Sequence, residues 1–127
     1  MISELGEGHE YINQENQLGT GHAVNLAKDY LKNKAENIMV LYGDHPFVGA
    51  ETIKKINEKH LGSGGKITLA TVKLSDFRDW RINFVNFSRI IRNGNEKIIK
   101  DIQFKDANDE ERKVTEVNPC YFCFQAT

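Results

Sequence analysis

The feature that most constrains the fold of this chain is an unbroken apolar run, Ile38-Met39-Val40-Leu41-Tyr42. The run has no polar position that could face water, and it stops abruptly at Gly43-Asp44. Such a run is typical of a strand that is buried on both faces of a parallel sheet. We therefore expect an α/β protein, with helices covering the sheet.

The patterns on either side of this run fit the same architecture. Apolar residues recur at helical spacing from Thr20, a candidate N-cap, to about residue 32, and a second helix is expected over about 51–60. After a glycine-rich break, residues 67–72 are rich in threonine and β-branched side chains and predict a strand. This spacing predicts a right-handed parallel crossover, with 38–42 and 67–72 neighbours or near-neighbours in one sheet.

The second half of the chain has a different pattern. Residues 89–92 and 98–104 are strand-like and flank Asn93-Gly94-Asn95, a sequence typical of a hairpin turn. A charged loop or short helical turn is expected over 105–111, and residues 114–124 return as a strand. Together the patterns predict one domain with a three-layer α/β/α, Rossmann-like fold and a mixed sheet.

The composition excludes several classes of partner. Lysine and arginine number 17 and aspartate and glutamate 18, so a net charge of −1 leaves no field for nucleic acid or an anionic membrane. No apolar run approaches membrane-spanning length, and the first residues lack the basic and apolar parts of a secretory signal. We expect a cytoplasmic protein.

The cysteine pattern indicates packing rather than chemistry. Cys120 and Cys123 have no second pair at zinc-ligand spacing, and the four histidines are dispersed. A redox pair would need its first thiol at a helix N-terminus, whereas these lie in a strand-like aromatic run. We expect both thiols to pack in the core.

Two loops are candidates for a ligand site. The segment from Tyr42 to Pro46 follows the carboxyl end of a strand, where ligands bind in open α/β sheets, and Asp44 there could hold a hard cation that carries phosphate oxygens. The segment from Gln17 to His22 brings glycines to a helix N-terminus, which suits an anion or a nucleotide edge. Taken singly, an aspartate that closes a buried strand is more often a helix or turn cap, and the segment from Gln17 to His22 is equally compatible with a loop and an N-cap.

Taken together, the two loops resemble a known family. The sequence Gln17-Leu18-Gly19-Thr20-Gly21-His22-Ala23, a helix, and then Leu41-Tyr42-Gly43-Asp44-His45-Pro46 resemble the uridylyltransferase domain of bifunctional bacterial N-acetylglucosamine-1-phosphate uridylyltransferases. These are sugar-phosphate nucleotidyltransferases with a MobA-like NTP transferase domain. The resemblance runs from about residue 10 to the C-terminus, and weaker matches follow in the same order at 71–74, 89–91, 105–107 and 116–118.

The resemblance implies a role for each matching residue. In the family, the position of Gln14 reads the uracil edge, that of Asp44 holds Mg²⁺, and that of Asn118 hydrogen-bonds the sugar. The implied nucleotide-binding residues are Gln14, Gln17, Gly19, Thr20, Tyr42 and Gly43.

Two positions of the sugar site depart from the family pattern. Ser88 replaces a glycine, and Gln103 replaces a sugar-binding glutamate, although both side chains can still hydrogen-bond a hydroxyl. An insertion at 77–84 lengthens the loop before Ser88. N-acetylglucosamine 1-phosphate is therefore the leading candidate for the acceptor, and another sugar stays open.

The implied reaction transfers a nucleotidyl group from a nucleoside triphosphate, UTP by resemblance, to a sugar 1-phosphate and releases pyrophosphate, with Mg²⁺ as cofactor. No glycine-rich triphosphate loop precedes Gln14, and the family's second magnesium ligand has no counterpart. We therefore expect residues 1–127 to be the central part of a nucleotidyltransferase domain, with little or no activity alone. A non-catalytic nucleotide- or sugar-binding protein and a nucleotidyltransferase for another acceptor are the alternatives.

Overall fold

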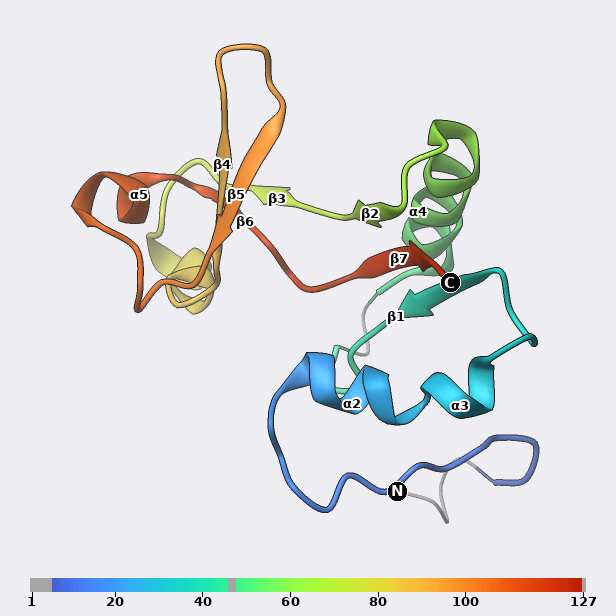
Figure 1. Cartoon of the computed structure of the whole chain (residues 1–127). Helices are drawn as coiled ribbons and strands as arrows, with labels where there is room; N and C mark the ends of the chain where they lie inside the picture. The colour runs from blue at the N-terminus through green and yellow to red at the C-terminus, as the bar shows by residue number, and fades with distance from the viewer. Residues whose placement is uncertain (1–5, 46–47, 127) are drawn as a thin grey trace. The chain divides into compact units, whose positions relative to one another are not determined.

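The structure of the chain is a computed structural model that describes residues 6–45 and 48–126 (Figure 1). The chain divides into two compact units. The N-terminal unit comprises residues 1–37 with 126–127, and the sheet unit comprises residues 38–125. Pro46, the last residue of the candidate ligand loop that begins at Tyr42, lies outside the described residues.

Among its described residues, the N-terminal unit contains two short helices, α2 (Thr20–Leu26) and α3 (Lys28–Leu31). The sequence predicted one helix over 20–32, but Ala27 ends α2 and the chain restarts as α3. Thr20 was expected to be the N-cap and is instead the first helical residue. Gly19 is the cap, with φ 99° and ψ 177°, a backbone conformation that glycine adopts without a β-carbon clash.

The sheet unit begins with a three-stranded sheet in the order β1 (Asn37–Val40), β7 (Phe122–Gln125), β2 (Ile67–Leu69). β7 runs antiparallel to β2, and the arrows of β1 and β2 point the same way in Figure 1. The prediction that 38–42 and 67–72 contribute near-neighbouring strands of one sheet, joined by a helix, is confirmed, but β7 lies between the two strands and the sheet is antiparallel rather than mixed. The mixed α/β class is confirmed with it.

The connecting helix α4 (Ala50–Ser63) packs against β2 and β7 and buries Ile56 and His60. It continues past His60, where we expected it to end, and stops before Gly64, whose φ of 62° suits the left-handed end of a helix. Because β1 lies at the sheet edge, its four residues are half-buried rather than buried on both faces as predicted.

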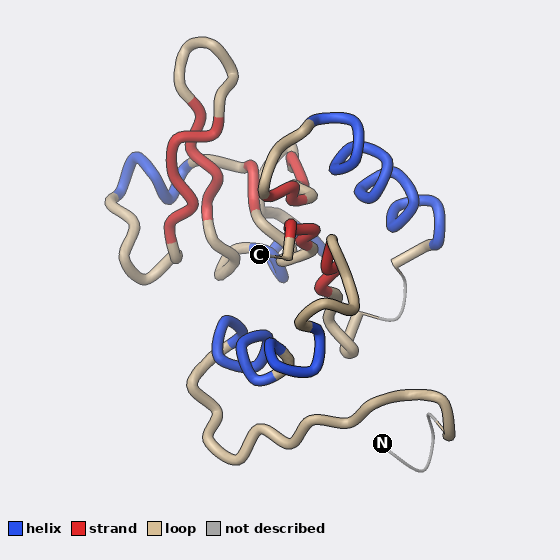
Figure 2. Tube along the Cα trace, turned by 45° about the vertical axis from the view of Figure 1, so that its right-hand side comes forward, coloured by secondary structure: helices blue, strands red, loops and turns tan. Residues whose placement is uncertain are grey.

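The second sheet is antiparallel, in the order β3 (Val72–Lys73), β6 (Glu116–Val117), β4 (Arg89–Arg92), β5 (Ile98–Ile102). Its core contains Leu74, Ile90 and Val117. The predicted hairpin is confirmed: β4 pairs with β5, and Figures 1 and 2 both show it extending from the rest of the sheet. The Asn93 side chain closes the turn by accepting from the N–H groups of Asn95 and Lys97.

Two expected strands, 67–72 and 114–124, are wrong as continuous elements, because each is divided between the two sheets. The pair Leu69↔Phe122 and the pair Val72↔Val117 enclose residues 70–71 on one side and 118–121 on the other. We call the longer side the 118–121 bulge. Pro119 has no N–H to donate there, and Cys120 has φ 66°, so the ladder cannot continue.

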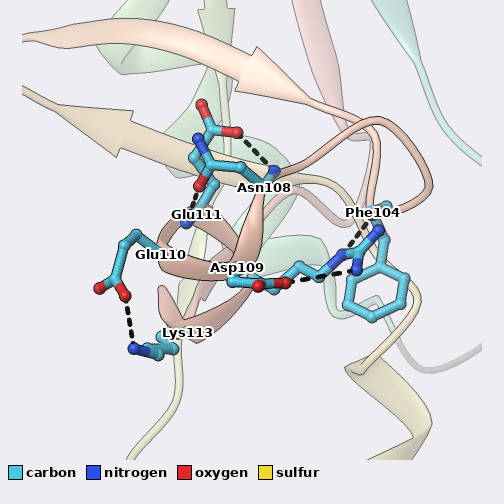
Figure 3. A network of polar contacts seen from close by, with 7 residues as sticks. Phe104, Asn108, Asp109, Glu110, Glu111 and Lys113 are labelled. Carbon is cyan, nitrogen blue, oxygen red and sulfur yellow. Dashed lines mark hydrogen bonds and ion pairs between the residues drawn. The ribbon is translucent and has the colours of Figure 1, made fainter.

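Two further elements cover the second sheet. The insertion forms a 3₁₀ helix, η1 (Asp79–Phe84), and the charged segment forms α5 (Asp109–Lys113), which packs on β4. α5 begins with a capping box: Asn108 Oδ1 accepts from the Glu111 N–H, and the Glu111 carboxylate accepts from the Asn108 N–H, both at 2.9 Å (Figure 3). These reciprocal bonds fix where α5 begins.

Candidate functional site

The loop after β1 places a carboxylate at the surface beside an aromatic cluster. The Tyr42 ring stacks on the His45 ring with their centroids 5.6 Å apart. His45 Nδ1 lies 2.7 Å from the Tyr121 hydroxyl, within hydrogen-bond distance. Asp44 Oδ1 is 4.0 Å from His45 Nε2, and the Asp44 side chain is 80% exposed. The ring contacts thus hold the loop against Tyr121, and the Asp44 carboxylate stays exposed.

The 118–121 bulge holds a buried amide in a fixed orientation. Asn118 is 2% exposed. Its Oδ1 accepts from the Cys120 N–H at 2.7 Å, and its Nδ2 donates to Asp101 Oδ2 at 2.7 Å. Its backbone N–H donates to the Ser88 carbonyl at 3.2 Å. The bulge therefore joins the segment before β4 to the end of β5.

The bulge contacts the loop after β1 through the Tyr121 hydroxyl, which lies 2.7 Å from His45 Nδ1. Burial raises the pKa of the Cys120 thiol, a hydrogen bond with Tyr42 opposes this, and the negative charge of Asp101 adds to it. Burial also raises the pKa of Tyr121, and the negative charge of Asp44 raises it further. The pKa values of Cys120 and Tyr121 are thus raised by two different carboxylates, Asp101 and Asp44 respectively.

The sequence-predicted residues of the sheet unit are only partly brought together. Tyr42 and Asp44 lie in the loop next to the bulge, and Ser88 is bonded directly to Asn118. Gln103 lies beyond the end of β5, with an exposed side chain and a carbonyl that accepts from the Asp106 N–H.

The remaining predicted residues belong to the N-terminal unit. Gln14 Nε2 donates to the Gly19 carbonyl at 3.3 Å and lies 2.9 Å from His22 Nδ1. Since a carbonyl only accepts, the amide nitrogen must face Gly19, and the Gln14 Oε1 points away from this contact. Gln17 and Thr20 are exposed. The expected meeting of these residues with Asp44 stays a prediction.

Sequence reasoning missed two features of the site. Asp101 was not singled out, although it lies two positions before Gln103, on the same side of a strand by the two-residue period. The partnership of His45 and Tyr121 was also missed, because the two residues lie far apart in the chain and no local pattern connects them.

Asp44 suits the predicted magnesium ion. In the described part of the chain, no three His, Cys, Asp or Glu side chains gather as a metal cluster. Mg²⁺ does not require such a cluster, because it is commonly held by one or two carboxylates together with substrate phosphates and water. The exposed carboxylate of Asp44, in the loop that follows β1, is a group of that kind. Across residues 6–45 and 48–126, no helix has the length and apolarity needed to cross a membrane.

The chain is similar to several curated proteins named bifunctional protein GlmU. It is 40% identical to that of Carboxydothermus hydrogenoformans over 124 residues, which cover 97% of this chain and 26% of the relative. For Geobacillus thermodenitrificans the identity is 37% over 121 residues, or 95% and 25% of the two chains. This chain is GlmU-like. No family model matches it.

The similarity covers only one part of the GlmU proteins. The chain spans about a quarter of the length of the curated relatives it matches, including that of Caldicellulosiruptor saccharolyticus, at 34% identity over 120 residues. The mixed α/β structure of this GlmU-like chain is consistent with a partial nucleotidyltransferase fold.

Proposed function

We propose that the chain is the central part of a sugar-phosphate nucleotidyltransferase domain. Its reaction transfers a uridylyl group from UTP to N-acetylglucosamine 1-phosphate, gives UDP-N-acetylglucosamine and releases pyrophosphate. The observation that carries the proposal is the GlmU similarity, which extends over 94% to 97% of this chain in the three relatives described above. We further propose that the protein acts in the cytoplasm on small molecules, not on nucleic acid or at a membrane.

The proposed chemistry needs positioning more than it needs a reactive side chain. An oxygen of the sugar 1-phosphate attacks the α-phosphorus of UTP, the new P–O bond forms, and the bond to the bridging oxygen of the β-phosphate breaks. Because the attacking oxygen is already anionic, no general base or covalent intermediate is required. The roles of the side chains are to hold the two substrates in line and to balance their negative charge.

Each predicted residue has a place in this scheme. Gln14, Gln17, Gly19 and Thr20 would hold the base and ribose, and Tyr42 and Gly43 would border the nucleotide. Asp44 would hold Mg²⁺, which when bound neutralises phosphate charge. Ser88, Gln103 and Asn118 would face the sugar. Support for the sugar side comes from the bond between the Asn118 N–H and the Ser88 carbonyl, because it unites two residues far apart in the sequence.

A graft tests the proposal. Residues of this chain replace the aligned segment in the GlmU protein of Carboxydothermus hydrogenoformans, to which the chain is 40% identical over 124 residues. We expect the graft to release pyrophosphate from UTP when N-acetylglucosamine 1-phosphate is present. Asp44→Asn in the graft should lower the rate by about 100-fold or more, because one preorganised charge is lost.

The control is Asp109→Asn, which removes the same charge from a side chain that is 93% exposed at the start of α5. This variant should leave the rate unchanged. A graft that folds, as judged by its thermal unfolding, and yet releases no pyrophosphate would refute the proposal. Equal rates for the Asp44 and Asp109 variants would refute the role given to Asp44.

A further inference from the structure

The Asp101 carboxylate is held in place by a buried amide and is otherwise open. Asp101 lies near the end of β5, and it is exposed. In the described part of the chain, the only hydrogen-bond partner of its carboxylate is Asn118 Nδ2, at 2.7 Å from Oδ2. An ionised carboxylate can accept about four hydrogen bonds, so most of its acceptor capacity is free.

The orientation of the Asn118 amide is unambiguous. Its Oδ1 accepts from the Cys120 N–H, a group that can only donate, so the nitrogen must face Asp101. With 2% of its surface exposed, Asn118 itself offers little to a ligand. Its amide instead aims the Asp101 carboxylate, and a ligand at this side of the bulge meets Asp101 first.

The 118–121 bulge links Asp101 to the loop after β1, because Asn118 bonds Asp101 and the Tyr121 hydroxyl lies 2.7 Å from His45 Nδ1. The negative charge of Asp101 raises the pKa of the Cys120 thiol, and the same thiol hydrogen-bonds with Tyr42. The carboxylate, the bulge and the loop that presents Asp44 are therefore neighbours within the sheet unit. A molecule bound beside Asp44 can therefore extend toward Asp101. Its far end must then suit a hydrogen-bond acceptor.

We infer that Asp101 is a specificity-determining residue that accepts a hydrogen bond from a hydroxyl group of the sugar acceptor. This inference rests on the proposed function and adds a residue to it. The carboxylate repels phosphate and accepts from hydroxyl groups, so it selects the uncharged end of a sugar 1-phosphate. Gln103, two positions further on, has no side-chain contact in the described structure that would aim it in the same way.

The test measures binding of N-acetylglucosamine 1-phosphate to the 127-residue chain by isothermal titration calorimetry. Asp101→Asn keeps the shape and can keep the bond to Asn118 while removing the charge. We expect it to weaken binding by about tenfold or more, as for loss of a hydrogen bond to a charged group. Its thermal unfolding should match the wild type. Asp109→Asn is the charge-matched control and should bind like the wild type.

Deoxy analogues separate direct contact from an indirect effect. The 3-, 4- and 6-deoxy forms of the sugar phosphate are titrated against both the wild type and Asp101→Asn. One analogue should bind the two proteins equally, because it lacks the hydroxyl that Asp101 contacts. If every analogue still distinguishes the two proteins, Asp101 acts only through other groups and the inference is wrong.

Two further outcomes are distinguishable. If Gln103→Ala weakens binding of the sugar phosphate and Asp101→Asn does not, the inference is overturned and the proposed function still stands. A wild-type chain that binds neither the sugar phosphate nor UTP would overturn the proposed function, and this inference with it.

Discussion

Replacing Arg89 by methionine should destabilise the sheet unit more than any exposed substitution. Arg89 is 0% exposed, and its guanidinium stacks between the rings of Phe77 and Phe104, 4.5 and 5.0 Å from their centroids. It donates to the carbonyls of Val85 at 2.7 Å, of Phe87, and of Arg112 at 3.3 Å. These contacts join η1, β4 and α5.

The buried charge has carbonyl dipoles rather than an acid as its partners. In the described part of the chain no carboxylate forms an ion pair with Arg89, and burial lowers its pKa. Methionine keeps much of the stem but leaves the three carbonyls without their donor. At about 1 kcal/mol for each of the three lost hydrogen bonds, the free energy of unfolding should fall by about 3 kcal/mol.

Urea denaturation followed by far-UV circular dichroism measures this change. The control is Arg78→Met, at an exposed arginine just before η1, which should change the free energy of unfolding by no more than about 0.5 kcal/mol. A loss of less than about 1 kcal/mol for Arg89→Met would show that water or a rearranged donor satisfies the three carbonyls. The argument that buried Arg89 stabilises the sheet unit by joining η1, β4 and α5 would then be refuted.

Two further substitutions test the second sheet. Glu116→Gln removes the charge that Arg92 contacts at 2.7 and 2.8 Å and should lower the free energy of unfolding by about 1–3 kcal/mol at neutral pH. The hydrogen bond from Arg92 lowers the folded-state pKa of Glu116, so this contribution is present above the ordinary glutamate pKa and is lost as pH falls through the folded value. Urea titrations from neutral to acid pH should therefore converge for variant and wild type; a constant gap would contradict the argument. Asn108→Ala, which removes the cap of α5, should cost about 1 kcal/mol in the same assay, and an unchanged midpoint would mean that α5 does not depend on it.

The elements that local patterns specify were predictable from the sequence. The apolar run at 38–42 stops at a glycine and an aspartate, the α4 segment has helical spacing, and Asn93-Gly94-Asn95 is a turn sequence. The divisions at 70–71 and 118–121 were not predictable in the same way. They depend on which residues pair across the sheets, and the strand preference of each segment taken alone is continuous.

The residues of the candidate site likewise fall into those that local motifs specify and those that depend on the folded arrangement. Asp44 and Asn118 came from motif positions, whereas Asp101 and the contact between His45 and Tyr121 arise only when the bulge folds. Arg89 is the clearest case, because an arginine in a strand pattern is ordinarily exposed, and only the carbonyls and rings around it explain its burial.

The length of the 118–121 bulge restricts which insertions and deletions this chain can accept. Four residues there face the two residues 70–71, so the excess is two, an even number. Side chains alternate along a strand, so an even excess keeps the inward positions of β6 and β7 in phase with those of β3 and β2. Loss of one residue would reverse that phase and exchange the buried Cys123 for its neighbours. Length changes at this point of the chain should therefore be accepted in pairs and rejected singly.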